Sequence, residues 1–438
     1  MKVHLAYGET GLDIEVPDRN LTVLEPEFVP SLHDEEGELQ AALGSPLGTP
    51  PFRQLAEEAC RRLKSGAGRL MGGGAPVAIV FCDVTRPIPT HKLLSPLLEE
   101  LRAAGFTRED VVLINALGMH RRNTAAELKA MLGDEIFRNY RVLQDQAGDS
   151  EAFGFAGRLA SGHDIFLNKH YLSAGLRILT GFIEPHLFAG MSGGAKLLLP
   201  GIAREDNIMY FHSAQMIGHP RSTLAVMEGN PVQETIREVG RLAPPDFILN
   251  VALNKHREIT AIFAGALGEA HAAGVSFVSA GALRPVPQLF DIVITTNSGY
   301  PLDMNLYQSV KGLVTARRVV KERGTIILAA ECREGLPEHG NFKAIMKRDK
   351  SPRAILDLVF SPGFSMRDQW EAQALCNVLE RADVYIKSSG LSPEDVETAL
   401  CTPIKSIERA LEELLRRYGQ EASVCVLPEG PQTVPYVV

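Results

Sequence analysis

The feature that most restricts the fold of this chain is a series of short apolar runs, each followed by a helical segment. The first two, VAIVFC and VVLINA, are apolar almost throughout, as in strands that are covered on both faces. Strands of this kind, separated by helices, predict an α/β fold built on parallel sheets. A second series begins after residue 287. The predicted strands are Val77–Cys82, Val111–Ala116, Leu176–Ile183, Phe247–Leu253, Phe290–Thr296, Thr325–Ala330, Val384–Lys387 and Val424–Leu427.

The length of the chain favours two domains, because a single hydrophobic core seldom serves 438 residues. The passage between the two series of strands is predicted at residues 280–287. We expect an N-terminal α/β domain of residues 1–282, to which the final segment 418–438 returns. Residues 283–417 are expected to form a C-terminal α/β domain.

Charge and cysteine content argue against several classes of protein. The net charge is −8 and no run of lysine and arginine offsets it, so a nucleic-acid-binding surface is not expected. The six cysteines are scattered without a Cys-x-x-Cys pair, which is typical of reduced thiols in a cytosolic protein. No apolar run is long enough to cross a membrane, and the N-terminus has no signal-peptide pattern. We therefore expect a cytoplasmic protein.

Residues 179–212 concentrate reactive groups among glycines. The glycines would let backbone N–H groups approach an anion, assisted by a helix that begins near residue 195. The segment does not fit a nucleotide-triphosphate loop, because its glycine spacing is too short and no Ser or Thr follows the lysine. A Ser-Gly-Gly loop that is only a turn is the alternative. The residues that favour a site are Gly190, Ser192, Gly193, Gly194, Lys196 and, on a later helix, His212.

Polar side chains directly follow three of the predicted strands. Because ligands bind at the carboxyl ends of parallel strands, we expect these side chains to meet at one edge of the sheet. A carboxylate there accepts hydrogen bonds from ligand hydroxyls, and a guanidinium suits a carboxylate ligand. The alternatives are an Asp–Arg pair that only stabilises its loop and histidines that are only structural. The residues are Asp83, Thr85 and Arg86 after the first strand, His120 after the second and His186 after the third.

A helix predicted for residues 304–320 carries Tyr307 and Lys311 on one face, with Gln308 beside them. With this group included, the chain resembles the nickel-dependent lactate racemases over nearly its whole length. The motifs that carry the resemblance are, in chain order, Asp83-x-Thr-Arg-Pro87, Gly118-x-His120, Pro185-His186, Ser192-Gly-Gly-x-Lys196, His212 and Tyr307-Gln308-x-x-Lys311.

The resemblance implies a nickel-pincer nucleotide, a pyridinium mononucleotide whose two sulfurs and one ring carbon bind nickel. In that family a lysine holds the nucleotide covalently, a histidine completes the nickel site, and two further histidines act as alternate acid/base groups. Carried over by motif, the covalent residue is Lys196, the nickel ligand His212, and the acid/base pair His120 and His186. The nucleotide contacts would be Asp83, Thr85, Ser192, Gly193, Gly194 and Tyr307, and the substrate contacts Arg86, Gln308, Lys311 and Trp370.

These residue types suit the racemisation of a 2-hydroxy acid. The C2 hydrogen is not acidic beside a carboxylate, so its removal as a hydride to a cofactor is the easier route. A neutral imidazole takes and returns the hydroxyl proton, and cations hold the carboxylate. We therefore expect a racemase or epimerase whose active site lies in the cleft between the domains, with cofactor-synthesis proteins as partners. Lactate is the default substrate, and malate, longer 2-hydroxy acids and aldonates stay open.

Two other functions are compatible with parts of this set. Lys196 also suits a Schiff base with a carbonyl substrate or pyridoxal phosphate, although nothing in that scheme requires His212. A non-catalytic carrier of the nickel nucleotide is the second alternative. A carrier would need no paired proton relay, so the presence of both His120 and His186 argues against it.

Overall fold

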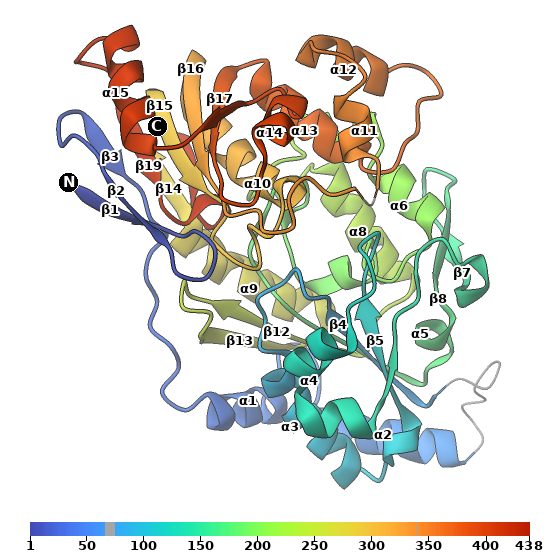
Figure 1. The fold of residues 1–438 in the computed structure, drawn as a ribbon. Coiled ribbons are helices and arrows are strands. Elements are labelled where there is room, and N and C mark those ends of the chain that lie inside the picture. The colour runs from blue at the N-terminus through green and yellow to red at the C-terminus, as the bar shows by residue number, and fades with distance from the viewer. Residues whose placement is uncertain (66–74, 339) are drawn as a thin grey trace.

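A computed structural model of the chain describes residues 1–65, 75–338 and 340–438. These residues form two six-stranded sheets, each flanked by helices, which lie in the lower and upper halves of the view in Figure 1. The predicted α/β class is confirmed. Among the helices of these same residues, none combines the length and the apolar character that a membrane crossing requires.

The first sheet has its centre at β4, whose first residue, Val77, pairs with Val111 on one side and with Leu176 on the other. The chain leaves this centre in opposite directions, which makes the carboxyl ends of the central strands a topological switch point, where α/β proteins bind ligands. All neighbouring strands are parallel except β12 and β13. In spatial order the strands are β13 (Ile259–Gly265), β12 (Phe247–Leu253), β9 (Leu176–Phe182), β4 (Val77–Cys82), β5 (Val111–Ala116) and β6 (Arg141–Leu143).

Helices cover both faces of the first sheet. Alternate side chains of its strands therefore enter two different hydrophobic clusters, one on each face. In β4, Ile79 and Phe81 lie in one cluster, and Ala78 and Val80 lie in the other. The strand is therefore apolar at every position, as its sequence predicted. The helices of this half include α1 (Glu35–Gly44), α2 (Phe52–Lys64), α3 (Thr90–Ala103), α4 (Ala125–Asn139), α5 (Lys169–Ser173), α8 (Pro231–Leu242) and α9 (Leu267–Ala282). The hairpin of β7 (Phe153–Arg158) and β8 (Asp164–Asn168) belongs to the same half.

The starts of two helices are built differently. Thr124 and Glu127 form a reciprocal capping box at the start of α4. Helix α2 begins after Pro51, and no side chain caps it. Proline can take this place because the first turn of a helix needs no N–H donor from it.

The second sheet is parallel throughout. Helices α10 and α13 lie in the large cluster on one face, whereas α15 and the N-terminal hairpin of β1 (Lys2–Leu5) and β2 (Leu12–Glu15) cover the other. Its strands are, in spatial order, β18 (Thr402–Ile404), β17 (Ala382–Lys387), β16 (Val320–Ala329), β15 (Phe290–Thr296), β19 (Val424–Leu427) and β3 (Leu21–Val23). Its helices are α10 (Leu306–Arg317), α11 (Phe342–Met346), α12 (Pro352–Val359), α13 (Gln369–Leu379), α14 (Pro393–Thr398) and α15 (Ile407–Tyr418).

Both ends of the chain differ from the predicted domain boundaries. Residues 418–438 were expected to return to the first domain, but β19 lies between β15 and β3 in the second sheet. The helix directly before it explains this, because a helical crossover normally returns a strand parallel into the sheet it left. The N-terminal β3 joins the same sheet as an edge strand. The last strand, β20 (Val434–Val437), pairs with β14 (Leu283–Val286) where the chain passes between the halves.

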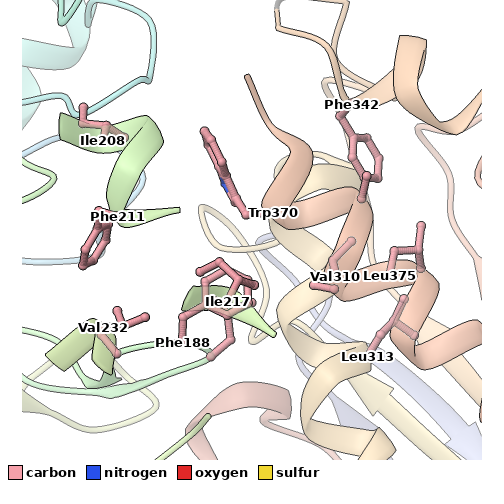
Figure 2. Close-up of a cluster of buried hydrophobic side chains, with 14 of the residues drawn as sticks. Phe188, Ile208, Phe211, Ile217, Val232, Val310, Leu313, Phe342, Trp370 and Leu375 are labelled. Atoms are coloured by element: carbon pink, nitrogen blue, oxygen red, sulfur yellow. The ribbon is translucent and has the colours of Figure 1, made fainter. Parts of the chain in front are cut away.

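Hydrophobic packing joins the two halves along one continuous cluster. Figure 2 shows Phe188, Phe211 and Ile217 of the first half on one side of Trp370, and Val310 and Leu375 of the second half on the other. The segments that meet there are α6 (Glu205–Phe211) and α7 (Ala214–Ile217) with α10 and α13. The position of the second half over the switch point of the first sheet is therefore fixed by buried apolar contacts.

Candidate active site

The carboxyl ends of the central strands of the first sheet open into a cavity of about 180 Å³, whose wall is completed by α10 and α13 of the second half. The cavity lies in the predicted inter-domain position. Its lining includes every predicted site residue except Gly190 and Gly194. The N–H of Gly194 points away, to Asn250 Oδ1 at 2.8 Å. The predicted residues that line it are Asp83, Thr85, Arg86, His120, His186, Ser192, Gly193, Lys196, His212, Tyr307, Gln308, Lys311 and Trp370.

Asp83, which is buried, and His120, which is half-buried, form an acid–imidazole pair. Asp83 follows β4 and His120 follows β5, and His120 Nδ1 lies 2.7 Å from Asp83 Oδ2. Burial alone would raise the pKa of Asp83, but His120, Arg86 and Thr85 outweigh it and lower the pKa below its ordinary value. Because an ionised carboxylate can only accept, His120 donates from Nδ1. In the neutral ring the nitrogen without a proton is then Nε2.

Hydrogen bonds extend this pair on both sides. Thr85 Oγ1 donates to Asp83 Oδ1 at 2.8 Å, and Arg86 Nη1 donates to Thr85 Oγ1 at 3.0 Å. Asp83 is thus held by the hydroxyl and the imidazole, and the guanidinium joins through the threonine. The alternative of a loop held by a direct Asp–Arg pair does not describe this arrangement.

The second half contributes an amide and an amine to the same network. Gln308 Nε2 lies 3.5 Å from His120 Nε2, and its Oε1 accepts a hydrogen bond from Lys311 Nζ at 2.5 Å. Asn305 caps α10 by accepting from the Gln308 N–H at 3.0 Å, which fixes the first turn that carries both side chains. Burial, and then Arg86, lowers the pKa of Lys311.

His186 is held in the opposite way from His120. It is the last residue of β10 (Pro185–His186), directly before the turn to β11 (Gly190–Met191). Its Nδ1 accepts hydrogen bonds from the N–H groups of two residues of that turn, Phe188 at 3.2 Å and Ala189 at 3.1 Å. Burial lowers the pKa of His186 well below its ordinary value, and the cations Lys196, Lys311 and Arg86 act in the same direction. The imidazole is therefore neutral at physiological pH.

His212 ends α6 with its imidazole buried, at 9% exposure. Its Nδ1 donates to the carbonyl of Ile208 at 2.9 Å, and its ring lies 4.4 Å from that of Trp370. Burial lowers the pKa of His212 to about 3, although the bond to Ile208 acts against this. The neutral ring therefore keeps the lone pair of Nε2 free, which is the state that binds a metal.

Lys196 is the buried amine of the cavity. Burial, and after it the neighbouring cations Arg86 and Lys311, lower its pKa to about 7. It belongs to a short 3₁₀ helix, Gly194–Leu197, which lies where the sequence predicted a helix to begin. A neutral amine at physiological pH is a nucleophile that can form a covalent bond to a ligand.

The Ser-Gly-Gly loop is built differently from the predicted anion cradle. Ser192 Oγ donates to the carbonyl of Phe182 at 3.0 Å and accepts from the N–H of Glu184 at 2.9 Å. Its carbonyl is bonded to His271 Nε2 at 2.9 Å. These bonds tie the loop to the end of β9, so the serine hydroxyl and the Gly194 N–H are engaged within the protein. As bonded here, the Ser192 hydroxyl and the Gly194 N–H both donate within the protein.

Helix α13 supplies side chains that sequence reasoning did not select. Gln369 Nε2 donates to the His212 carbonyl at 3.5 Å, and Gln373 Nε2 donates to the Ala214 carbonyl at 2.9 Å. Glu371 lines the cavity at 3% exposure, burial raises its pKa, and its Oε1 has no hydrogen-bond partner among the described residues. The signal was present in the sequence, since QWEAQ places three long polar side chains around the single tryptophan of the chain.

Comparison with known proteins decides the family. Two family models match, the lactate racemase N-terminal domain over residues 7–225 and the lactate racemase C-terminal domain over residues 287–434. The lactate racemase of Thermoanaerobacterium thermosaccharolyticum is 33% identical over 437 residues, which cover 99% of this chain and 98% of that protein. The chain belongs to the lactate racemase family. The predicted resemblance and the predicted enzyme class, a racemase, are confirmed.

Two further comparisons agree with this membership in the lactate racemase family. The lactate racemase of Lactiplantibacillus plantarum is 32% identical over 434 residues, which cover 98% of each chain. The structure of the lactate racemase apoprotein from T. thermosaccharolyticum has a TM-score of 0.88 at 33% identity and covers 99% of this chain and 100% of its own. The match of the C-terminal family domain through residue 434 also agrees with the position of β19 in the second sheet.

Proposed function

We propose that this protein racemises a small 2-hydroxy acid, with lactate as the first candidate, and that the C2 hydrogen moves as a hydride to and from a nickel-pincer nucleotide. The observation that carries the proposal is the cavity, in which three histidines, a buried amine and a guanidinium meet from distant parts of the chain. The two similar proteins named lactate racemase support the substrate class. The cytoplasmic location and the cofactor-synthesis partners stay predictions from the sequence.

The residues of the cavity fit the nucleotide. His212 offers Nε2 as a nickel ligand, because Ile208 holds the proton on Nδ1. Lys196, with a pKa lowered to about 7, offers the amine for the covalent link. Within the described ranges, no group of three His, Cys, Asp or Glu side chains could hold a metal ion without further ligands. This is compatible with the proposed site, in which the protein supplies only one nickel ligand. When bound, the nucleotide supplies a reversible acceptor for the C2 hydride.

The other residues bind and orient the acid. Arg86 and Lys311 are the cations proposed to hold its carboxylate, and both lie next to the His120–Asp83 pair through hydrogen bonds. His120 takes the hydroxyl proton at Nε2, and the ionised Asp83 stabilises the imidazolium that forms. His186 lines the same cavity and is proposed to contact the same hydroxyl group. Closure by the second half keeps water from the reacting carbon.

The proposal is tested with protein produced together with the cofactor-synthesis proteins. Pure D- or L-lactate, and in parallel malate, longer 2-hydroxy acids and aldonates, are incubated with it and separated by chiral chromatography. We expect either enantiomer of one acid to approach an equal mixture. Metal analysis should find nickel, and the intact mass should show an adduct that Lys196→Arg lacks. Loaded protein that racemises none of these acids would indicate a carrier, and an imine absorption band without nickel would indicate a Schiff-base enzyme.

A further inference from the structure

We propose that Glu371 selects the substrate by a hydrogen bond to a hydroxyl group on C3, so that the enzyme prefers 2,3-dihydroxy acids to 2-hydroxy acids with an apolar side chain. This inference rests on the proposed function and deepens it by naming the substrate class. The acid/base roles of His120 and His186, and the contacts of Arg86 and Lys311 with the carboxylate, stay as proposed.

The argument begins with the carboxyl group of Glu371, which is buried in the wall of the cavity. The side chain lines the cavity at 3% exposure, and no residue of the described chain is a hydrogen-bond partner of its Oε1. A buried polar atom without a partner costs stability, so nearly all such atoms in proteins are paired. For a carboxyl group in the wall of a ligand cavity, the missing partner is a group of the ligand.

Helix α13 turns Glu371 away from the contacts that hold this helix against the first half. Gln369 and Gln373, four residues apart, both donate to carbonyl groups of the first half, those of His212 and Ala214. Glu371 lies two residues from each of them, and residues two apart do not share a helix face. Packing of the two halves therefore does not account for this carboxyl group.

The charges around Glu371 place it near the substrate carboxylate. After burial, the strongest influence on its pKa is the ammonium group of Lys311, one of the two cations proposed to hold that carboxylate. Lys311 Nζ itself donates to Gln308 Oε1 at 2.5 Å. In a 2-hydroxy acid, C3 is two bonds from the carboxylate carbon. A hydroxyl group on C3 is therefore within reach of a side chain that lies beside Lys311.

The carboxyl group of Glu371 is suited to a hydroxyl group. Burial raises its pKa, so it keeps its proton to higher pH than an exposed glutamate and does not repel the carboxylate of the acid. A protonated carboxyl has both a donor and an acceptor, and a hydroxyl group pairs with either. The methyl group of lactate pairs with neither and would leave the carboxyl group unpaired. Sites built to bind a hydroxyl group reject analogues that lack it for this reason.

Two acids of nearly equal size test the proposal. Glycerate carries a CH₂OH group on C2, where 2-hydroxybutyrate carries an ethyl group. One enantiomer of each is incubated with the loaded enzyme, and chiral chromatography gives kcat/KM. Because the two enantiomers of an acid are equally stable, kcat/KM is the same in both directions. The ratio of the two values within one preparation is independent of its cofactor content. We expect the native enzyme to prefer glycerate by at least about 100-fold.

Glu371→Met and Glu371→Gln are the matched variants. Methionine has a similar length but only a weakly accepting sulfur, so the ratio should fall to about one or below. Glutamine keeps a donor and an acceptor, and its ratio should stay within about tenfold of the native value. A native ratio near one, or a high ratio that Glu371→Met leaves unchanged, would overturn the proposal.

Two further measurements do not depend on turnover. In the cofactor-free protein, Glu371→Met should raise the midpoint of thermal unfolding, because it removes an unpaired buried polar group. Lower midpoints in both variants would show that the carboxyl group is paired within the protein, which would overturn the proposal. The mass adduct at Lys196 should be unchanged in Glu371→Met, and its loss would assign the carboxyl group to the nucleotide instead. If the native loaded enzyme racemises no 2-hydroxy acid at all, the proposed function itself is contradicted.

Discussion

The Nε2 atoms of Gln308 and His120 lie 3.5 Å apart across the boundary between the two halves of the molecule. Gln308 is oriented for this contact because its Oε1 accepts from Lys311 Nζ, which turns the amide NH₂ toward the imidazole. The second half thus presents an amide and a cation together to the His120–Asp83 pair of the first. Binding of a carboxylate and handling of a proton both depend on how the halves lie against each other.

Gln308→Met should raise the KM for the 2-hydroxy acid about tenfold, because Lys311 loses the acceptor that holds it and a loss of about 1.4 kcal/mol corresponds to that factor. Methionine keeps the length of the side chain. Initial rates of the loaded enzyme over a range of acid concentrations measure the change. Gln54→Met, at an exposed position of α2, is the matched control. A KM within twofold of the native value would show that Gln308 does not position Lys311.

Asp83→Asn should lower kcat by about 10² to 10⁴-fold in both directions. An amide carries no charge to stabilise the His120 imidazolium, and it can donate to Nδ1 and so reverse the tautomer that Asp83 enforces. Chiral chromatography of reactions started from each enantiomer gives the rates, and circular dichroism checks that the fold is retained. A loss of less than tenfold would mean that His120 does not need the carboxylate.

The sequence was sufficient for the features that depend on local pattern. Fully apolar runs such as β4 indicated parallel strands, and Asp83 and His120 were placed correctly because each lies just past the end of such a run. The convergence of these residues on one cavity then followed from the topology of the sheet. Motif spacing also indicated Gln308 and Lys311, because residues three or four apart share a helix face.

Features that depend on distant partners were not accessible in the same way. The pairing of β19 with β3 joins segments near the two ends of the chain, and no local pattern specifies it. The hydrogen bonds of the Ser192 hydroxyl with the backbone of Phe182 and Glu184 could not be predicted either, because they depend on how the loop folds back on the end of β9. Tautomers of the histidines depend on which group faces each nitrogen, which is a property of the folded chain alone.

Gly193→Ala should destabilise the protein by about 2–4 kcal/mol and reduce cofactor loading. Gly193 has a φ of 79°, and an added Cβ would lie 2.7 Å from Ile183 Cγ1 and 2.8 Å from Asn250 Oδ1. Urea unfolding and the mass adduct at Lys196 measure the two effects. Gly268→Ala in α9 has open space around the new methyl group and should be neutral or stabilising by up to about 1 kcal/mol. Equal unfolding free energies and equal adduct content in the two variants would show that the loop at Gly193 does not position Lys196.

The cofactor-free protein should lose stability as the pH falls below about 6.5, in part through His212. The unfolded ring titrates near about 6.5, whereas burial lowers the folded pKa to about 3. Between these values the unfolded state binds the proton and the folded state does not, so the free energy of unfolding decreases as the pH falls. From pH 7 to pH 5 the contribution of this ring is about 2 kcal/mol. His186 acts in the same direction.

Urea unfolding at pH 7 and pH 5 measures this loss, and His212→Gln should reduce it because the amide does not titrate. The native protein and the variant are compared at each pH, so that other titrating groups cancel. An identical loss in both proteins would show that His212 is protonated equally in the folded and unfolded states.

At neutral pH, Lys196 should react faster with a small amine-reactive reagent than surface lysines do. Its pKa is lowered to about 7, first by burial and then by Arg86 and Lys311, so the amine is mostly neutral above that pH. Ordinary lysines titrate near about 10.4 and gain roughly tenfold in neutral amine with each pH unit up to that value. Competitive labelling of the cofactor-free protein with acetic anhydride, read by peptide mass spectrometry, compares the two kinds of lysine. The reactivity of Lys196 should level off above pH 7 to 8, while that of the exposed lysines continues to rise. If the reactivity of Lys196 instead rose in parallel with that of the exposed lysines up to pH 10, Lys196 would be an ordinary ammonium group at neutral pH. The covalent link would then require another group to remove its proton.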